Sequence, residues 1–452
     1  MTSLRQTVQS WMQDKLVRKV VRNSGYLLIG NTLSSVVSSV LTGRLLGVLG
    51  FGITGTIISF ASNINRLLSF RMGELVGKYV AQYLAEDKKD LAAASLKAAA
   101  LTETLTSLAA YILLALSAPL AARYIIKDTT TTPLIILYAL ALLANFVTET
   151  STGFLQVSGH FRSQGVITFV QSMATAAVIV YAYIVKGDIW LVMGAYLLGK
   201  SVNGLALAGV AAYWARQVLG PGWLRTPLKS LPERRKFWGF AVSTNLSGTV
   251  TTLVRDNEEV WISLLISPLA TGYYKAAKAL VNLVMTPITP FIGATYPELT
   301  RAVAEKAWAR LRSLLRRLTF LSGAWTLAAG LGLLVLGRWL VTAFYGADFA
   351  PAYPAMLILL IGFGLANTLY WNRNLLLSFN QPNYPLKVTA ILGFVKIVLT
   401  FLLVPVFGYL AEAALLSAFQ AVSVSLLAWR GLREIKAQEH ENGTRTSAEE
   451  RG

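Results

Sequence analysis

The feature that most constrains this chain is a long apolar segment that recurs along almost the whole of its 452 residues. A helix that spans a bilayer needs about 20 mostly apolar residues, because lipid offers no partners to backbone N–H and C=O groups. Twelve segments meet this requirement. They lie near residues 25–48, 53–81, 97–118, 134–157, 164–185, 189–214, 238–267, 270–296, 317–344, 352–378, 387–404 and 410–430. We therefore expect an all-α polytopic membrane protein with about 12 transmembrane helices.

Composition narrows the chemistry that such a chain can perform. Hydrophobic residues make up 54% of it and charged residues 14%, whereas soluble domains carry about 25% charged residues. Cysteine is absent, which excludes disulfides, thiolate zinc sites and thiol nucleophiles. The two histidines, His160 and His440, are far apart in the sequence and form no metal-binding motif. We expect no catalytic residues, no metal and no cofactor.

Positive charge indicates the orientation of the chain in the membrane. The net charge of +19 would suggest nucleic acid in a soluble protein, but in a membrane protein it reflects Lys and Arg in cytoplasmic loops. If the N-terminus is cytoplasmic, the inner loops hold 27 Lys and Arg and the outer loops hold three, Arg123, Lys127 and Lys186. This asymmetry predicts a multi-pass protein with both termini inside and no nucleic-acid partner. The basic amphipathic stretch 1–24 is expected to stay attached, because the apolar run behind it is as long as a membrane span.

The sequence also indicates two related halves. The segment AEDKK at 85–89 is echoed by AEK at 304–306, 219 residues on, and GFLQVSG at 153–159 is echoed by NLLLSFN at 374–380, 221 residues on. Six spans in each half is an even number, which predicts parallel repeats. We expect two six-helix lobes that face each other across a central cavity. The predicted segments are an amphipathic N-terminal stretch 1–24, an N-lobe 25–214, a cytoplasmic linker 215–237, a C-lobe 238–430 and a polar tail 431–452.

Charged residues inside the predicted spans are candidates for function. An ionised side chain at the bilayer centre costs at least about 2.5–3.5 kcal/mol, so such residues should face protein or water. The second span carries Arg66, Arg71, Glu74 and Lys78, and the last three share one face with Asn63. This polar stripe either lines a cavity or forms a structural ladder of ion pairs.

The seventh predicted span holds the densest charge cluster in any apolar segment. Arg255 and Glu259 are four residues apart and can pair, whereas Asp256 and Glu258 need other partners. The nearest candidates share one face of the next span: Lys275, Lys278 and Asn282.

Further polar residues predict a cavity wall. Two stripes follow helical spacing: Asn145, Thr148, Glu149, Thr152 and Gln156 in the fourth span, and Asn367, Tyr370, Trp371 and Asn374 in the tenth. Lys200, Arg373 and Lys396 add single positive charges. Lys and Arg outnumber Asp and Glu within the predicted spans. A cationic cavity of low dielectric selects anions, because each uncompensated cation there is unfavourable until a negative group arrives.

Six short motifs carry a family resemblance over roughly residues 22–430. They are LLGVLGFG at 45–52, YVAQY at 79–83, GYYKAA at 272–277, YPEL at 296–299, FYGADF at 344–349 and PVFG at 405–408, with Ala413 and Ala414 after the last. In order and spacing the chain resembles the Wzx-type polysaccharide and oligosaccharide flippases, including those for O-antigen, of the multidrug/oligosaccharidyl-lipid/polysaccharide (MOP) exporter superfamily.

The resemblance implies a flippase, not an enzyme, of the bacterial inner membrane. Such a protein moves a polyprenyl-diphosphate-linked oligosaccharide from the cytoplasmic to the outer leaflet by alternating access. Its implied contacts with the diphosphate and sugar are Arg66, Arg71, Lys200, Arg255, Lys275, Lys278 and Arg373. Glu74, Glu149, Asp256 and Glu259 are candidates for coupling to H+ or Na+. The run of acids at 256–259 is heavier than the family pattern, so Arg255 is expected to serve either Glu259 or substrate. Implied partners are the lipid-linked oligosaccharide, the bilayer, and the polymerase and glycosyltransferases that act on the same glycan.

Three other functions are alternatives to this hypothesis. A multidrug exporter of the same superfamily, a MATE-type antiporter for protons or Na+, would share the fold but would favour an acid-dominated cavity. A membrane enzyme acting on lipid-linked sugars would need carboxylates on the outer face, where the longest predicted loop, near 119–133, offers only Asp128. A scaffold without transport would not need so many charges inside the membrane.

Overall fold

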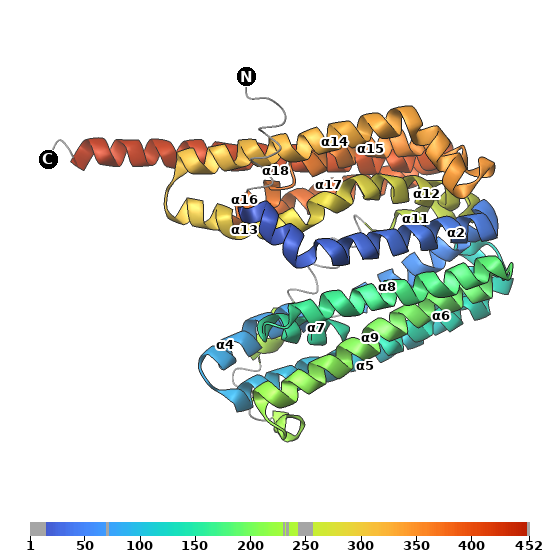
Figure 1. Ribbon diagram of the computed structural model, residues 1–452, viewed down its shortest axis with the longest axis horizontal. Helices are drawn as coiled ribbons and strands as arrows, with labels where there is room; N and C mark the ends of the chain where they lie inside the picture. The colour runs from blue at the N-terminus through green and yellow to red at the C-terminus, as the bar shows by residue number, and fades with distance from the viewer. Residues whose placement is uncertain (1–14, 69–71, 229–230, 232–234, 243–255, 450–452) are drawn as a thin grey trace. The chain divides into compact units, whose positions relative to one another are not determined.

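The fold is entirely helical in every part that the structure, a computed structural model, describes: residues 15–68, 72–228, 231, 235–242 and 256–449 (Figure 1). Within these residues, nine helices are long and apolar enough to cross a membrane, or ten if the bent pair Pro268–Ile292 and Thr295–Ala304 forms one span. The predicted all-α polytopic membrane fold is confirmed.

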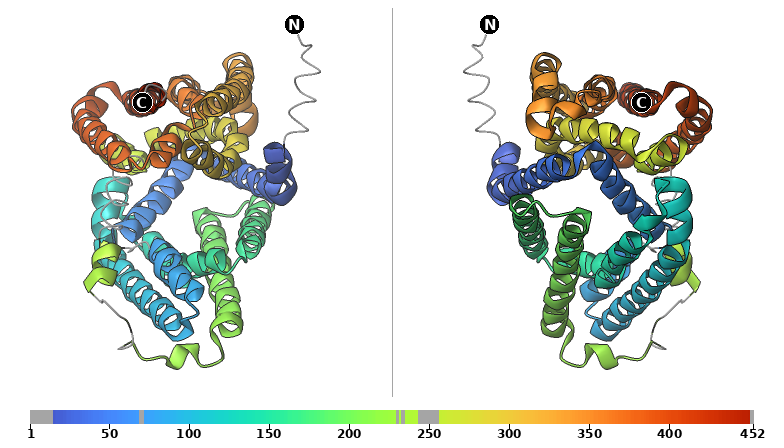
Figure 2. Two further views of the ribbon diagram at one scale, coloured as in Figure 1. Left: turned by 90° about the vertical axis from the view of Figure 1, so that its left-hand side faces the viewer. Right: turned by 90° about the vertical axis from the view of Figure 1, so that its right-hand side faces the viewer.

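Contacts divide the chain into two compact units, Leu27–Gly272 and Tyr273–Gly452, the second of which also includes Met1–Tyr26. The division falls within two helices and not in the predicted linker 215–237, because the helix that starts at Glu258 packs with the first unit. The predicted lobe boundaries therefore stay a prediction. In each unit the long helices lie side by side (Figures 1 and 2).

The first unit contains most of the helices that shape the candidate site. Its elements are α2 (Lys15–Leu68, which begins before the unit), α3 (Met72–Leu75), a π-helical turn (Val76–Val80), α4 (Ala81–Ala85), α5 (Lys89–Leu120), a second π-helical turn (Ala121–Ile126), α6 (Thr132–Ala144), α7 (Thr148–Val157), α8 (Phe161–Ile184), α9 (Ile189–Leu219) and α11 (Glu258–Leu265). Short 3-10 turns lie at Thr129–Thr131 and Trp223–Arg225.

The second unit repeats this pattern with longer final helices. Its elements are α12 (Pro268–Met285), α13 (Thr289–Ala304), α14 (Trp308–Tyr345), α15 (Ala352–Thr368), α16 (Asn372–Ser378), α17 (Asn383–Phe407) and α18 (Tyr409–Glu449), with 3-10 turns at Thr286–Ile288 and Ala347–Phe349. The first residues of α12 belong to the first unit.

The span count of nine or ten differs from the predicted twelve for two reasons. The first two predicted spans share α2, which is interrupted at Gly47, where φ is 65° and ψ is −175°. This backbone conformation has positive φ, which glycine adopts without the steric cost of a Cβ. The seventh predicted span, 238–267, lies partly outside the described residues, and the structure describes only its residues 238–242 and 256–267, the latter including α11.

Four left-handed turns recur in the two halves of the chain at separations of 219 to 222 residues. The pairs of positive-φ residues are Asp87 with Lys306, Lys127 with Gly346, Gly159 with Asn380, and Lys186 with Gly408. Helix breaks recur as well, since α6 and α7 are separated by three residues and so are α15 and α16. The backbone thus repeats with the period that the sequence echoes indicate.

Near each turn of the first pair, at Asp87 and Lys306, a cation lowers the pKa of a nearby carboxyl group. Lys88, which donates a hydrogen bond to Glu86 at 2.7 Å, lowers the pKa of that carboxyl. Arg301, which donates to Glu305 at 2.7 Å, lowers the pKa of Glu305. Both carboxylates lie just before the long helix of their half, α5 or α14, and outside the candidate spans.

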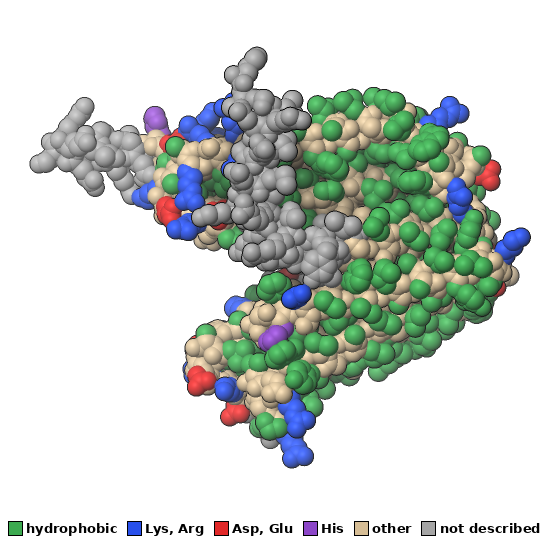
Figure 3. Space-filling view, viewed as in Figure 1, with side chains coloured by type: hydrophobic (Ala, Val, Ile, Leu, Met, Phe, Trp, Pro, Cys, Tyr) green, Lys and Arg blue, Asp and Glu red, His purple; other side chains and the backbone are tan. Residues whose placement is uncertain are grey.

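The surface between the helix ends is apolar. On the face shown in Figure 3, charged side chains gather near the ends of helices and hydrophobic side chains cover the lengths between them. Along α14, for example, Leu327, Val335 and Trp339 are 63–76% exposed. Such a surface suits contact with lipid, since water would leave its large side chains unfavourably hydrated.

Candidate functional site

A polar cavity of about 230 Å³ lies within the first unit, among α2, α5, α6, α7 and α9. Its polar lining residues are Ser62, Asn65, Arg66, Glu103, Ser107, Tyr138, Asn145, Thr148, Glu149, Lys200 and Asn203. Five of them are residues that the sequence singled out: Arg66, Asn145, Thr148, Glu149 and Lys200. They come from three separate parts of the chain, and the fold brings them together.

Lys200 supplies the cavity with an ammonium group that the protein leaves open. The residue lies in the middle of α9, is exposed, and lines the cavity. Within the described part of the chain its side chain makes no hydrogen bond and no ion pair, although its backbone C=O accepts from Asn145 Nδ2 at 3.3 Å. A cation in such a cavity gains from an added anion, because no described residue forms an ion pair with it.

Arg66 also lines the cavity, but it already has a counter-ion. Its guanidinium donates to Asp256, and the two side chains are 50% and 46% exposed. An ion pair this accessible to solvent is weak, about 0–1 kcal/mol. Arg66 can therefore exchange Asp256 for another anion at little cost.

Glu103 has a structural role that the sequence analysis did not assign. It is 3% exposed and lies on α5, where its carboxylate accepts hydrogen bonds from the backbone N–H groups of Glu149 and Thr150, each at 2.8 Å. These N–H groups belong to the first turn of α7, which has no intrahelical partners for them. A buried carboxylate thus caps the helix that restarts after the break at residues 145–147. The two partners are 46 and 47 residues away, so no local motif signals the cap.

Glu149 is the second carboxylate of the cavity, and it is exposed. Within the described residues its side chain has no hydrogen-bond partner. The lining thus holds two cations, Arg66 and Lys200, and two carboxylates, Glu103 and Glu149. Of these four groups, Lys200 and Glu149 have no ion pair with a described residue, and the cationic cavity predicted between two lobes stays a prediction.

The start of α11 contacts α2 beside this cavity. Ser59 donates to Glu259 at 2.9 Å, Asn63 Nδ2 donates to Asn257 Oδ1, and Arg66 pairs with Asp256. Asn63, predicted to line a cavity, is 7% exposed and belongs to this contact. The predicted pair of Arg255 with Glu259 lies outside the described residues, as does Arg71.

The other described residues of the predicted stripe on the second span, Glu74 and Lys78, have different surroundings. Glu74 and Lys78 are both exposed, and Lys78 Nζ lies 4.3 Å from the ring centroid of Phe240. The turn Val76–Val80 is π-helical, so it holds more residues than an α-helical turn and changes the facing of later side chains. Gln156, predicted as lining, is exposed at the end of α7 and donates to Gln164 at 3.4 Å.

In the second unit, several predicted lining residues hold helices together. Asn367 is 1% exposed and donates to Thr326 at 2.8 Å, and Trp371 is 2% exposed and donates to Thr319 at 2.8 Å. Asn374 donates to the backbone C=O of Ile292 at 2.7 Å. These contacts join α15 and α16 to α13 and α14, which is a structural role.

The predicted cations of the second unit are less buried. Lys275 and Lys278 are partly exposed on α12, and Lys278 Nζ lies 5.9 Å from the ring centroid of Tyr274. Asn282 and Arg373 are exposed. Arg373 makes no hydrogen bond or ion pair within the residues that the structure describes. The role of these residues in binding the diphosphate and sugar stays a prediction.

Lys396 is not a free cation. Its ammonium lies 3.2 Å from Glu412 Oε1, and the side chains are 4% and 0% exposed. Thr400 donates to Glu412 Oε2 at 2.8 Å. Glu412 lies on the next helix, beyond the turn at Gly408. Both side chains of this ion pair are buried, and the pair joins α17 to α18.

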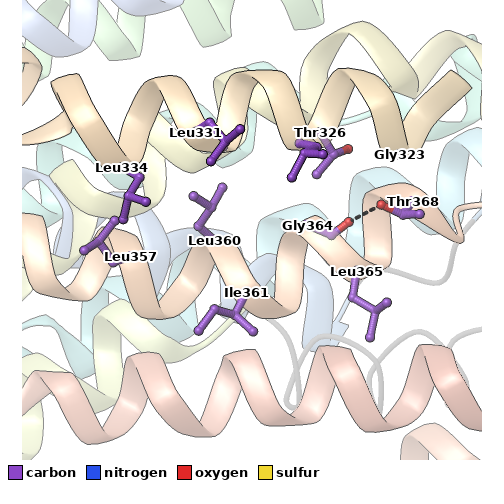
Figure 4. Close-up of a pocket in the computed structure, with 12 residues that line it drawn as sticks. Gly323, Thr326, Leu331, Leu334, Leu357, Leu360, Ile361, Gly364, Leu365 and Thr368 are labelled. Carbon is purple, nitrogen blue, oxygen red and sulfur yellow. Dashed lines mark hydrogen bonds between the residues drawn. The ribbon is translucent and has the colours of Figure 1, made fainter. Parts of the chain in front are cut away.

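A larger groove, of about 730 Å³, lies between α14 and α15 (Figure 4). Apart from glycines it is lined by leucines, Ile361, Thr326 and Thr368. Both hydroxyls donate to backbone carbonyls of their own helices, Thr326 to Ser322 at 2.6 Å and Thr368 to Gly364 at 2.9 Å. The groove suits hydrocarbon and offers no free polar group, so the smaller cavity is the better candidate for a polar ligand.

Comparisons with known proteins agree with this architecture. The family model described as "Polysaccharide biosynthesis protein" matches residues 20–303. The inner membrane protein YghQ of Escherichia coli is 22% identical over 360 residues, which cover 76% of this chain and 98% of that protein.

Two solved structures share the fold. One is a multidrug resistance MATE family transporter of the MOP superfamily in an inward-facing conformation, with 14% identity, a TM-score of 0.75, and coverage of 91% of this chain and 96% of that one. The other is a MOP superfamily transporter of Pyrococcus furiosus, described by the reverse polarity of its binding pocket, with 14% identity, a TM-score of 0.66, and coverage of 93% and 96%. The chain belongs to the polysaccharide biosynthesis protein family, and its fold is that of MOP superfamily transporters.

Proposed function

We propose that this protein is a flippase for a polyprenyl-diphosphate-linked oligosaccharide, which it moves from the cytoplasmic to the outer leaflet of a bacterial inner membrane. The observation that carries the proposal is the ammonium of Lys200, which has no ion pair with any described residue and lies in a cavity walled by candidate membrane-spanning helices. Membership of the polysaccharide biosynthesis family and similarity to an inner membrane protein support the substrate class and the location. Both termini are proposed to be cytoplasmic.

The chemistry of the cavity suits a diphosphate with sugars attached. Lys200 is an open cation, and Arg66 offers a planar fork of donors that matches phosphate oxygens. Asn65, Asn145 and Asn203 can exchange hydrogen bonds with sugar hydroxyls. A lipid tail would stay in the bilayer while the head moves. A membrane potential that is negative inside favours outward movement of each negative charge by about 2.3 kcal/mol per 100 mV.

Coupling to an ion is part of the proposal. Glu74, Glu149, Asp256 and Glu259 are the candidates, and Glu149 is favoured because it shares the cavity with Lys200. A carboxylate that binds H+ or Na+ only when the phosphate is absent would link the two movements. Glycosyltransferases and a polymerase would supply and consume the lipid-linked glycan.

The test uses reconstituted proteoliposomes that contain fluorescent undecaprenyl-diphosphate-linked oligosaccharide. Lys200→Gln should reduce the rate of flipping at least about tenfold, since one strong charge-assisted contact is lost. Arg216→Gln is the matched control, because Arg216 lies on the same helix near its end, is exposed, and does not line the cavity. Equal flipping rates for the wild type and Lys200→Gln would contradict the proposal.

A multidrug antiporter is the second candidate, and the observation that favours it is the carboxylate of Glu149, which lines the cavity and has no partner among the described residues. A cationic drug would bind Glu149 and be repelled by Lys200. The two functions therefore predict opposite results. Glu149→Gln should abolish drug export and Lys200→Gln should not, if the protein exports cations.

A further inference from the structure

The contact between α2 and the start of α11 is built from three polar side-chain pairs. On α2 the residues are Ser59, Asn63 and Arg66, which follow i, i+4 and i+7 spacing and so lie on one face. Their partners are consecutive or nearly so in the chain: Glu259, Asn257 and Asp256. We name these three pairs the α2–α11 latch.

The pairs of the α2–α11 latch differ in their exposure to water: one is buried and one is exposed. Asn63 is 7% exposed and Asn257 is 7% exposed, so their hydrogen bond is shielded. Arg66 and Asp256 are 50% and 46% exposed, and Arg66 also lines the polar cavity. A ligand in the cavity can therefore reach one end of the latch while the other pairs stay covered.

Arg66 is the residue at which a ligand and the latch compete. Asp256 offers it one carboxylate, whereas a diphosphate offers several oxygens and more negative charge. A diphosphate would also contact Lys200, which lines the same cavity and has no partner in the described part of the chain. The exposed pair with Asp256 contributes little, so the exchange favours the ligand.

We propose that Asp256 is the resting counter-ion of Arg66, and that an anionic phosphate head entering the cavity replaces it and loosens the start of α11 from α2. The identity of the anion rests on the proposed function, but the exchange at Arg66 does not. The far end of α11 keeps its own contacts, Ser263 with the C=O of Ile125 at 2.8 Å and Lys127 with the C=O of Ile266 at 2.7 Å. Release therefore begins at the end beside the cavity.

The first experiment measures binding of inorganic pyrophosphate to the purified full chain in nanodiscs. Asp256→Asn keeps the shape but removes the competing charge, so pyrophosphate should bind about two- to fivefold more tightly. Asp87→Asn is the matched control, because Asp87 is exposed in a turn with φ of 54°, a conformation that asparagine tolerates. Unchanged affinity in Asp256→Asn relative to this control would overturn the exchange.

The second experiment measures the opening itself. The chain has no cysteine, so Ser59→Cys with Glu259→Cys gives one defined pair on an otherwise unreactive background. A short bifunctional thiol reagent should bridge the pair, and pyrophosphate should slow bridging at least about threefold. Adding Arg66→Gln should remove the pyrophosphate effect. If pyrophosphate does not slow the bridging reaction, the proposed release of the α2–α11 latch is wrong.

Different results would contradict the proposed flippase function and the proposed release of the α2–α11 latch. If pyrophosphate slows bridging through Arg66 while undecaprenyl-diphosphate-linked oligosaccharide is not flipped, the latch stands and the proposed cargo is wrong. If the oligosaccharide is flipped at the full rate by protein in which the pair is bridged, the proposed function stands and the latch is wrong.

Discussion

Glu103 and Glu149 show how two carboxylates in one cavity acquire different tasks. Glu103 is 3% exposed and is held by two backbone N–H groups of α7, so its charge stabilises the helix start. Glu149 is exposed and has no side-chain partner in the described part of the chain, so it is available to a ligand or an ion. The difference comes from the neighbours and not from the residue type.

Replacement of Glu103 should therefore destabilise the fold. Glu103→Ala leaves two buried N–H groups without an acceptor, which costs about 1–3 kcal/mol or more. Thermal unfolding in detergent, followed by tryptophan fluorescence, should show a clearly lower midpoint. Glu149→Gln is the control and should unfold like the wild type. A midpoint for Glu103→Ala within error of the wild type would show that the cap contributes nothing.

At the scale of helices, close packing decides where small residues are needed. Gly204 on α9 faces the end of α6, and a Cβ added there would lie 2.1 Å from the backbone oxygen of Ala144. Gly209, on the same helix, has no heavy atom within 4 Å of such a Cβ. The first glycine thus allows α9 to approach the helix break that forms the cavity wall, as small residues do in membrane helix packing.

The matched pair Gly204→Ala and Gly209→Ala tests this packing. Gly204→Ala should destabilise the protein by about 1–3 kcal/mol, because backbone must shift to admit the methyl group. Gly209→Ala should be neutral or slightly stabilising, since alanine favours the helix. Thermal unfolding of both variants provides the measurement. Equal midpoints would indicate that α9 moves freely relative to α6.

The sequence predicted the positions of the helices better than it predicted which side chains of different helices contact each other. Hydropathy located the long helices, and the charge stripes located Arg66, Asn145, Glu149 and Lys200, which line one cavity. The cap at Glu103 and the partner of Lys396 were missed because they join residues on different helices. Asn367 and Trp371 were predicted as lining but are buried and bonded within their unit, since a polar stripe looks alike whether it faces a cavity or another helix.

At the scale of the whole chain, the repeated turns make a prediction about topology. Turns at Asp87 and Lys306 fall in loops predicted to be cytoplasmic, and turns at Lys127 and Gly346 fall in loops predicted to be outside. Corresponding turns are therefore predicted to lie on the same side of the membrane, as parallel repeats require. The proposed orientation, with both termini inside, fixes which side that is.

Single cysteines at the two ends of one span can test this orientation. Thr129→Cys lies beyond the end of α5 and Lys89→Cys at its start, and both positions are exposed. In intact bacterial cells, a membrane-impermeant maleimide should label Thr129→Cys and spare Lys89→Cys. Permeabilised cells should label both. Labelling of Lys89→Cys alone in intact cells would reverse the topology.

The cap on α7 has a consequence for how cargo preference can change. A free helix start attracts anions through its own amide groups, so its selectivity is fixed by the backbone. Here Glu103 already occupies those amides. Under the proposed function, preference between cargoes of different charge then depends on the side chains of Arg66, Lys200 and Glu149, which can be exchanged without rebuilding a helix. Relatives with the same scaffold could thus diverge toward new cargoes by a few substitutions in one cavity.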